Sequence, residues 1–218
     1  MRSAVFVGMS IGHEEANAIF PSTYFPPIRR GDIPKLDESV KLVGIIDGVF
    51  SSESSVGHRE IISLLKRGVI VVGGGSMGAL RAAELQDLGM IGVGKIFELY
   101  RDGTLEGDDE VALVFDPETF QPLSEPLVNI RYLLSSAVKA GVIDIEEKEA
   151  LILEMKALFF PRRSFDSLLA SAVNLLGEER AGIMRNMLGS NSFDLKRSDS
   201  LKVLYTMKEL QTAHRDRQ

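Results

Sequence analysis

Three short apolar runs constrain the fold of this chain more than any other feature of its sequence. They occupy residues 3–8, 42–47 and 69–73, and each ends in Gly or is followed by Gly. None alternates polar with apolar residues, which is typical of parallel strands covered by helices on both faces. Segments 58–67 and 77–88 have helical composition and follow the second and third runs. Together these segments predict a βαβα core with a right-handed crossover.

The remainder of the chain differs from this core in composition and in the spacing of its apolar residues. Segment 21–36 holds four Pro, which predicts irregular structure. Residues 107–115 combine an acidic cluster with an apolar run that predicts a short strand. From residue 144 onward, apolar residues recur at helical spacing. We therefore predict an α/β fold: a small parallel sheet with flanking helices, followed by a mainly helical C-terminal part. The predicted division is 1–135 and 136–218, as two domains or one continuous domain.

Composition excludes several classes of function. The chain has no cysteine, so we expect no disulfide framework, iron–sulfur cluster, thiolate zinc site or cysteine nucleophile. Its three histidines, His13, His58 and His214, are too scattered to predict a His-rich metal site. We predict no metal and no cofactor. A net charge of −6 argues against a nucleic-acid partner.

Hydropathy bears on the location of the protein. No stretch approaches about 18 consecutive apolar residues, so no transmembrane helix is predicted. The apolar run at the N-terminus is too short for a signal peptide. We therefore expect no membrane partner and a cytoplasmic location.

The glycine-rich turn after the third apolar run is the first candidate site. Residues 74–78 read G-G-S-M-G, which matches the G-x-S-x-G elbow that exposes a nucleophilic serine at a helix N-terminus. Ser76 is thus a candidate nucleophile, with backbone N–H groups available to an oxyanion. Two alternatives stay open. Ser76 can be a helix N-cap, or Gly74 and Gly75 can form a cradle for an anion.

Other candidates follow the first two predicted strands. Ser10 lies just past segment 3–8, and Asp47 ends segment 42–47. The carboxyl ends of parallel strands meet at one edge of a sheet, where ligands bind. We expect Ser10, Asp47 and Ser76 to share that edge. Ser10 can also be a plain turn residue, and Asp47 can either contact a ligand or cap the following loop.

His58 and Arg59 begin the helix predicted after Asp47. His58 can act as a base for Ser76, or can be an ordinary surface histidine. Arg59 cannot act as a base, because a guanidinium does not lose its proton in proteins. It can bind an anionic substrate group.

Two charged clusters complete the candidates. Arg29 and Arg30 follow two prolines and can bind an acidic partner, or can belong to a solvated loop. Residues 107–110 (G-D-D-E) resemble a metal-binding cluster, but an acidic helix N-terminus explains them as well.

The motifs FVGMS, PPIRRGD, GIIDGVF, HREI, GGGSMGALRAAEL, GMIGVGKIFELYRDG, DDEVAL and LSEPLVNIR occur in that order along residues 4–135. In order and spacing they resemble the core of the TfuA family. The resemblance implies a partner of a YcaO-family enzyme, which replaces a backbone amide oxygen of a peptide with sulfur. It also implies hydrolysis of the thiocarboxylate of a small ThiS-like sulfur-carrier protein, releasing sulfide. The implied peptide belongs to methyl-coenzyme M reductase in some relatives and to natural-product precursors in others.

The resemblance further implies a Ser–Lys dyad. The family pattern H-K-E-I would put the lysine at position 59, where this chain has Arg59. Ser76 is the expected nucleophile with Ser10 in reserve, and Lys95 and Lys35 are the candidate bases. The alternatives are a non-catalytic adaptor that docks YcaO and its peptide, and a generic serine esterase-like hydrolase.

Overall fold

The computed structural model describes residues 1–51, 53–190 and 193–216. The chain forms two compact units, Met1–Asp108 with Lys196–Gln218, and Asp109–Leu195. The division expected after residue 135 falls inside helix α5 (Leu127–Lys139).

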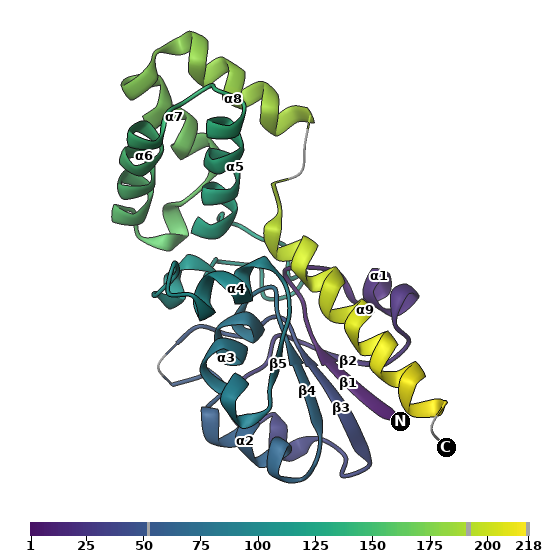
Figure 1. Cartoon of the computed structure of the whole chain (residues 1–218). Helices are drawn as coiled ribbons and strands as arrows, with labels where there is room; N and C mark the ends of the chain where they lie inside the picture. Colours follow the sequence, from purple (N-terminus) through teal and green to yellow (C-terminus); the bar gives the residue numbers. More distant parts are fainter. Residues whose placement is uncertain (52, 191–192, 217–218) are drawn as a thin grey trace. The chain divides into compact units, whose positions relative to one another are not determined.

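The first unit contains a five-stranded, all-parallel sheet in the order β2-β1-β3-β4-β5 (Figure 1). Its elements are β1 (Arg2–Phe6), α1 (His13–Ile19), β2 (Thr23–Phe25), η1 (Ile33–Lys35), β3 (Val40–Ile45), α2 (His58–Lys66), β4 (Ile70–Gly73), α3 (Met77–Leu85), η2 (Gln86–Leu88), β5 (Ile91–Gly92), α4 (Lys95–Arg101) and α9 (Leu195–Arg215). The short helix η3 (Asp108–Glu110) spans the point in the sequence where the first unit gives way to the second.

The predicted fold class is confirmed, since the three apolar runs form β1, β3 and β4. Two sequence predictions are wrong. Residues Thr23–Phe25 in the proline-rich segment pair with β1 as a strand. Residues 107–115 contain a 3-10 helix and one isolated bridge, from Phe115 to Pro122, instead of a strand. The apolar residues after this 3-10 helix, such as Val111 and Ala112, are buried outside any strand.

Helices cover both faces of the sheet, as the unalternating strands predict (Figure 1). On one face the apolar side of α9 joins the core that α1 also lines, and Met207 lies against the bare Cα of Gly44 in β3. On the other face α3 packs so closely on β3 that a Cβ at Gly78 would lie 1.7 Å from the carbonyl oxygen of Ile45. The glycines therefore set how near the helices come to the sheet.

The second unit is helical. Its elements are α5 (Leu127–Lys139), α6 (Ile145–Ala157), η4 (Phe160–Arg162), α7 (Phe165–Leu176) and α8 (Glu178–Ser190). Their apolar residues form one core that includes Leu133, Leu151, Leu168 and Met184. Side-chain caps begin two of these helices: Asp144 accepts a hydrogen bond from the Glu147 N–H, and Ser164 accepts one from the Ser167 N–H.

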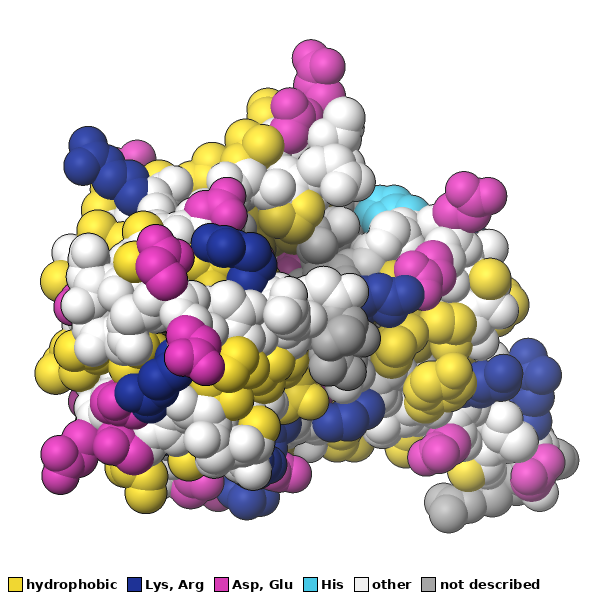
Figure 2. Space-filling model, turned by 90° about the horizontal axis from the view of Figure 1, so that it is seen from above, with side chains coloured by type: hydrophobic (Ala, Val, Ile, Leu, Met, Phe, Trp, Pro, Cys, Tyr) yellow, Lys and Arg dark blue, Asp and Glu magenta, His cyan; other side chains and the backbone are white. Residues whose placement is uncertain are grey.

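Within the described residues, no helix is long and apolar enough to cross a bilayer. Figure 2 shows Lys and Arg side chains interspersed with Asp and Glu over the face in view. The visible charge is thus mixed in sign rather than gathered into one basic surface.

Candidate functional site

The carboxyl edge of the sheet brings three candidate residues to one place. The chain turns at Gly8 after β1, at Asp47 after β3 and at Gly74 after β4. All these strands are parallel, so Ser10, Asp47 and Ser76 lie at the same edge. Backbone hydrogen bonds join these strand ends: the Gly74 N–H donates to the Ile45 carbonyl at 3.3 Å.

Asp47 is the centre of this edge and is fully buried. Its Oδ2 accepts hydrogen bonds from the backbone N–H groups of Gly8 at 3.0 Å and Ser10 at 2.8 Å. Its Oδ1 accepts one from the Ser10 hydroxyl at 2.6 Å. Asp47 therefore holds the turn after β1 and fixes the position of Ser10.

A lysine that sequence analysis missed reaches the same carboxylate. The Nζ of Lys196 lies 3.9 Å from the Oδ1 of Asp47, and the Lys196 side chain is only 2% exposed. Lys196 belongs to the first turn of α9, which begins at Leu195. The carboxyl edge thus holds a buried lysine, a buried carboxylate and two buried serines.

The sequence does carry a signal for this lysine. Lys196, Ser200, Val203 and Met207 are spaced by three or four residues, so they lie along one stripe of α9. Val203 and Met207 pack in the core of the sheet unit. Polar residues that continue an apolar stripe are buried with it, and buried polar groups require partners.

Ser76 is fully buried, and its hydroxyl has no hydrogen-bond partner among the described residues. It occupies the N-cap position of α3 with φ −149° and ψ −118°, but its side chain makes no capping hydrogen bond. A buried hydroxyl without a partner is unusual in a native fold. The arrangement leaves the Ser76 Oγ available to a group that enters the site.

The glycines before Ser76 permit a close approach by α9. Gly75 has φ +75°, and a Cβ there would lie 2.8 Å from the Ser200 Oγ and 3.3 Å from the Lys196 carbonyl oxygen. A Cβ at Gly74 would lie 2.6 Å from the Val93 carbonyl oxygen. The turn that carries Ser76 is therefore packed directly against the first turns of α9.

His58 and Arg59 lie at the surface, at the start of α2. The Nε2 of His58 lies 2.8 Å from the Oε2 of Glu84 on α3, to which Arg81 also donates at 2.6 Å. The Arg59 side chain is exposed. The imidazole is thus engaged with Glu84 rather than with Ser76.

The lysines proposed from sequence are exposed and paired with carboxylates. Lys35 donates to Asp32 at 3.0 Å, and its side chain is 75% exposed. Lys95 donates to Glu98 at 3.0 Å with 53% exposure, and this hydrogen bond lowers the pKa of Glu98. Both of these lysines are exposed, whereas the Lys196 side chain is buried.

The arginine loop begins at the same edge of the sheet. Ile28 forms a parallel bridge with Gly48, and the Ile28 N–H donates to the Asp47 carbonyl oxygen at 2.9 Å. Arg29 and Arg30 follow directly, and both are exposed. The loop therefore presents two cations beside the strand end that carries Asp47.

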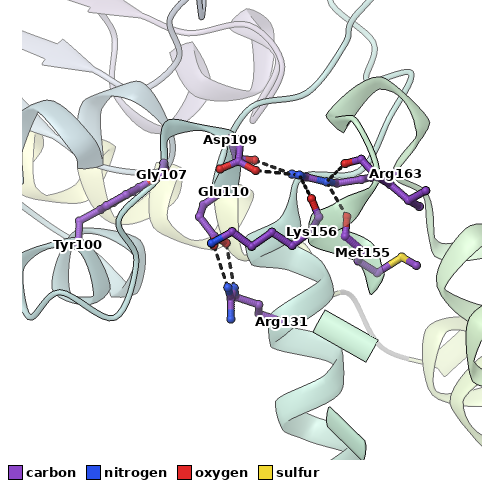
Figure 3. A network of polar contacts seen from close by, with 9 residues as sticks. Tyr100, Gly107, Asp109, Glu110, Arg131, Met155, Lys156 and Arg163 are labelled. Atoms are coloured by element: carbon purple, nitrogen blue, oxygen red, sulfur yellow. Dashed lines mark hydrogen bonds and ion pairs between the residues drawn. The ribbon is translucent and has the colours of Figure 1, made fainter. Parts of the chain in front are cut away.

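Two residues of the acidic cluster, Asp109 and Glu110, form ion pairs with arginines. In the second unit, the buried Glu110 accepts two hydrogen bonds from Arg131, both at 2.8 Å (Figure 3). Asp109 accepts one from the buried Arg163 at 2.7 Å. No three His, Cys, Asp or Glu residues of the described chain are grouped as a metal site. These carboxylates stabilise the unit by pairing with guanidinium groups.

Comparison with protein families identifies a match to this chain. A family described as TfuA-like protein matches residues 47–164, more than half of the 218-residue chain. The matched region includes Asp47 and Ser76 and ends before Lys196. No curated protein matches the chain.

Proposed function

Because this chain belongs to the TfuA-like family, we propose that it hydrolyses the C-terminal thiocarboxylate of a small ThiS-like sulfur-carrier protein. The sulfide released supplies a YcaO-family enzyme that thioamidates a peptide, such as a segment of methyl-coenzyme M reductase. The observation that supports this proposal is the juxtaposition of the buried Lys196 and Asp47 with the glycine-rich turn that carries Ser76.

In the first step, Ser76 is the nucleophile and Lys196 is the base, once its ammonium group has lost a proton. The Ser76 Oγ attacks the thiocarboxylate carbon, and its proton passes to the Lys196 Nζ, which must first move within hydrogen-bond distance because the Ser76 hydroxyl has no partner in the closed structure. The C–S bond then breaks, and the sulfur leaves as hydrosulfide with the proton from Lys196. The product is an ester between Ser76 and the carrier. The N–H groups of Ser76, Gly78 and Ala79 donate to backbone carbonyls, so these three must be released before they can stabilise the oxyanion that forms in between.

In the second step, water replaces the serine. Lys196 takes a proton from water, whose oxygen attacks the ester carbon. The Ser76 Oγ leaves with that proton, and the carrier departs as a carboxylate with release of one proton. Water and thiocarboxylate are thus converted to carboxylate, hydrosulfide and a proton, and the enzyme is restored.

Asp47 and Ser10 have positioning roles in this scheme. Asp47 binds the turn after β1 through three hydrogen bonds and lies 3.9 Å from the Lys196 Nζ. The Ser10 hydroxyl already donates to Asp47, whereas the Ser76 hydroxyl has no partner. This difference favours Ser76 over Ser10 as the nucleophile.

The test measures sulfide release from a thiocarboxylated carrier. Ser76→Ala and Lys196→Arg should each abolish release, because arginine keeps the charge of lysine but cannot accept a proton. Lys95→Arg and Lys35→Arg are matched controls at exposed lysines and should retain release. If Lys95→Arg or Lys35→Arg abolishes release instead, the base is that lysine.

Other outcomes contradict the scheme. Full release by Lys196→Arg would show that residue 196 acts by charge alone. Release that survives Ser76→Ala and fails in Ser10→Ala would make Ser10 the nucleophile. A chain that binds YcaO and peptide but never releases sulfide would be a non-catalytic adaptor. Turnover of p-nitrophenyl esters without any carrier would indicate a generic esterase.

A further inference from the structure

Every group of the proposed site is sealed from solvent. The exposed fractions are 0% for Ser76 and Asp47, 2% for Lys196 and 4% for Ser10. The C-terminal tail of a carrier protein cannot reach a hydroxyl with no accessible surface. If the site acts on such a tail, an element that covers the site must move.

The first turn of α9 packs against Gly75, the residue before Ser76. The Lys196 carbonyl oxygen and the Ser200 Oγ lie against the Cα of Gly75, next to Ser76. The Ser200 hydroxyl donates to the Lys196 carbonyl at 2.7 Å, which keeps this turn intact. The same turn delivers the Lys196 ammonium to Asp47. One helical turn thus lies against the residue before Ser76 and also supplies the lysine of the site.

Polar contacts on two sides hold this turn in place. On one side Arg197 donates to Glu15 of α1, and both side chains are partly exposed. On the other side the fully buried carboxylate of Asp199 accepts a hydrogen bond from the Ile96 N–H at 2.7 Å. Gly94 allows this approach, because a Cβ there would lie 2.3 Å from the Asp199 Cγ.

The rest of α9 is held differently. Val203, Leu204 and Met207 pack in the apolar core of the sheet unit, so this part of the helix stays in place. The first N–H groups of a helix have no intrahelical acceptor, so unwinding a first turn breaks few backbone hydrogen bonds. The polar first turn can therefore open while the apolar part remains packed.

We propose that the first turn of α9, residues 196–199, is a built-in cover that closes the Ser76 site and opens to admit the acyl tail of the substrate. This inference rests on the proposed function, because the cover has a purpose only if a substrate tail enters the site. The opening of the cover can nevertheless be tested without any carrier protein. Opening exposes Ser76, and closing returns Lys196 to the carboxyl edge of the sheet.

The experiment uses the absence of cysteine from the chain. Ser76→Cys introduces a single thiol, whose reaction with a small disulfide reagent reports access to the site. Ser63→Cys is the matched control, because Ser63 is exposed on α2. We expect the thiol at position 76 to react at least about tenfold more slowly, since it reacts only after local opening. Equal labelling rates for the thiols at positions 76 and 63 would contradict the proposed cover.

Loosening the cover should speed labelling. In the Ser76→Cys background, Glu15→Gln should raise the rate by about two- to fivefold, the range expected for a partly exposed ion pair. Glu14→Gln, one residue away on α1, should leave it unchanged. Asp199→Ala should raise the rate further, provided that circular dichroism shows a folded chain. If Glu15→Gln and a folded Asp199→Ala both leave the rate unchanged, the first turn of α9 is not the cover.

The outcomes separate the cover from the hydrolysis. Slow labelling that Glu15→Gln accelerates, with no sulfide release by the unmodified chain, would support the cover and contradict the hydrolytic function. Sulfide release together with fast labelling would support hydrolysis and contradict the cover.

Discussion

The Nζ of Lys196 lies 3.9 Å from the Oδ1 of Asp47, and neither side chain has more than 2% of its surface exposed. The two residues are 149 positions apart in the sequence. Their contact joins the start of α9 to the end of β3 at the edge where Ser76 lies. A buried ion pair of this kind adds little net stability, but removing one partner leaves an uncompensated charge.

The first prediction concerns this pair. Lys196→Met should lower the free energy of unfolding by about 3 kcal/mol, because Asp47 then keeps a buried charge without its cation. The double variant Asp47→Asn with Lys196→Met should lose less than the sum of the single variants. Urea unfolding of all four proteins measures the coupling. Strict additivity would show that the two side chains do not interact.

The second prediction compares the two serines. Ser76→Ala should change the free energy of unfolding by less than about 0.5 kcal/mol, because the hydroxyl that it removes has no hydrogen-bond partner. Ser10→Ala should cost about 1.5–3 kcal/mol, because the Ser10 hydroxyl donates to a buried carboxylate. Thermal and urea unfolding provide the comparison. Equal losses at both positions would contradict the assignment of hydrogen bonds at this edge.

The third prediction concerns the exposed arginines of the loop after β2. Charge reversal by Arg29→Glu with Arg30→Glu should weaken binding of an acidic carrier protein by about tenfold at low ionic strength. The loss should shrink as salt screens the charges. Titration of the carrier at two salt concentrations measures both effects. Unchanged affinity at low salt would mean that the carrier docks elsewhere.

The fourth prediction concerns acid stability of the helical unit. The hydrogen bond from Arg180, and then the one from the Asp144 N–H, lower the pKa of Glu147 below its ordinary value of 4.5. A carboxyl with a lowered folded pKa contributes stability above its unfolded pKa, and loses it as the pH falls through the folded pKa. Glu147→Gln should therefore reduce stability at pH 7 and flatten its decline below pH of about 4.5.

Urea unfolding of the two proteins at neutral and acid pH checks this prediction. Glu154→Gln, at an exposed position of α6, is the matched control and should follow the unmodified chain. Parallel stability curves for Glu147→Gln and the unmodified chain would show that Glu147 does not titrate with folding.

Local sequence was sufficient to predict the central strands and the helices that cover them. The runs at 3–8, 42–47 and 69–73 are apolar on both faces, so burial in a parallel sheet is nearly forced on them. A parallel sheet in turn places Ser10, Asp47 and Ser76 at one edge. Strands β2 and β5 were not predicted, because they are only three and two residues long. They become strands through pairing, β2 with β1 and β5 with β4.

The spacing of residues along α9 predicts that Lys196 is buried, but it does not predict which carboxylate Lys196 meets. Lys35 and Lys95 lie nearer to the glycine-rich turn along the chain, yet both pair with carboxylates at the surface. Lys196 reaches Asp47 because the apolar stripe of α9 packs on the sheet and carries the first turn of the helix to its carboxyl edge. That contact depends on how α9 packs on the sheet, which is a tertiary contact between distant parts of the chain. Residue spacing within a helix does not predict such a contact.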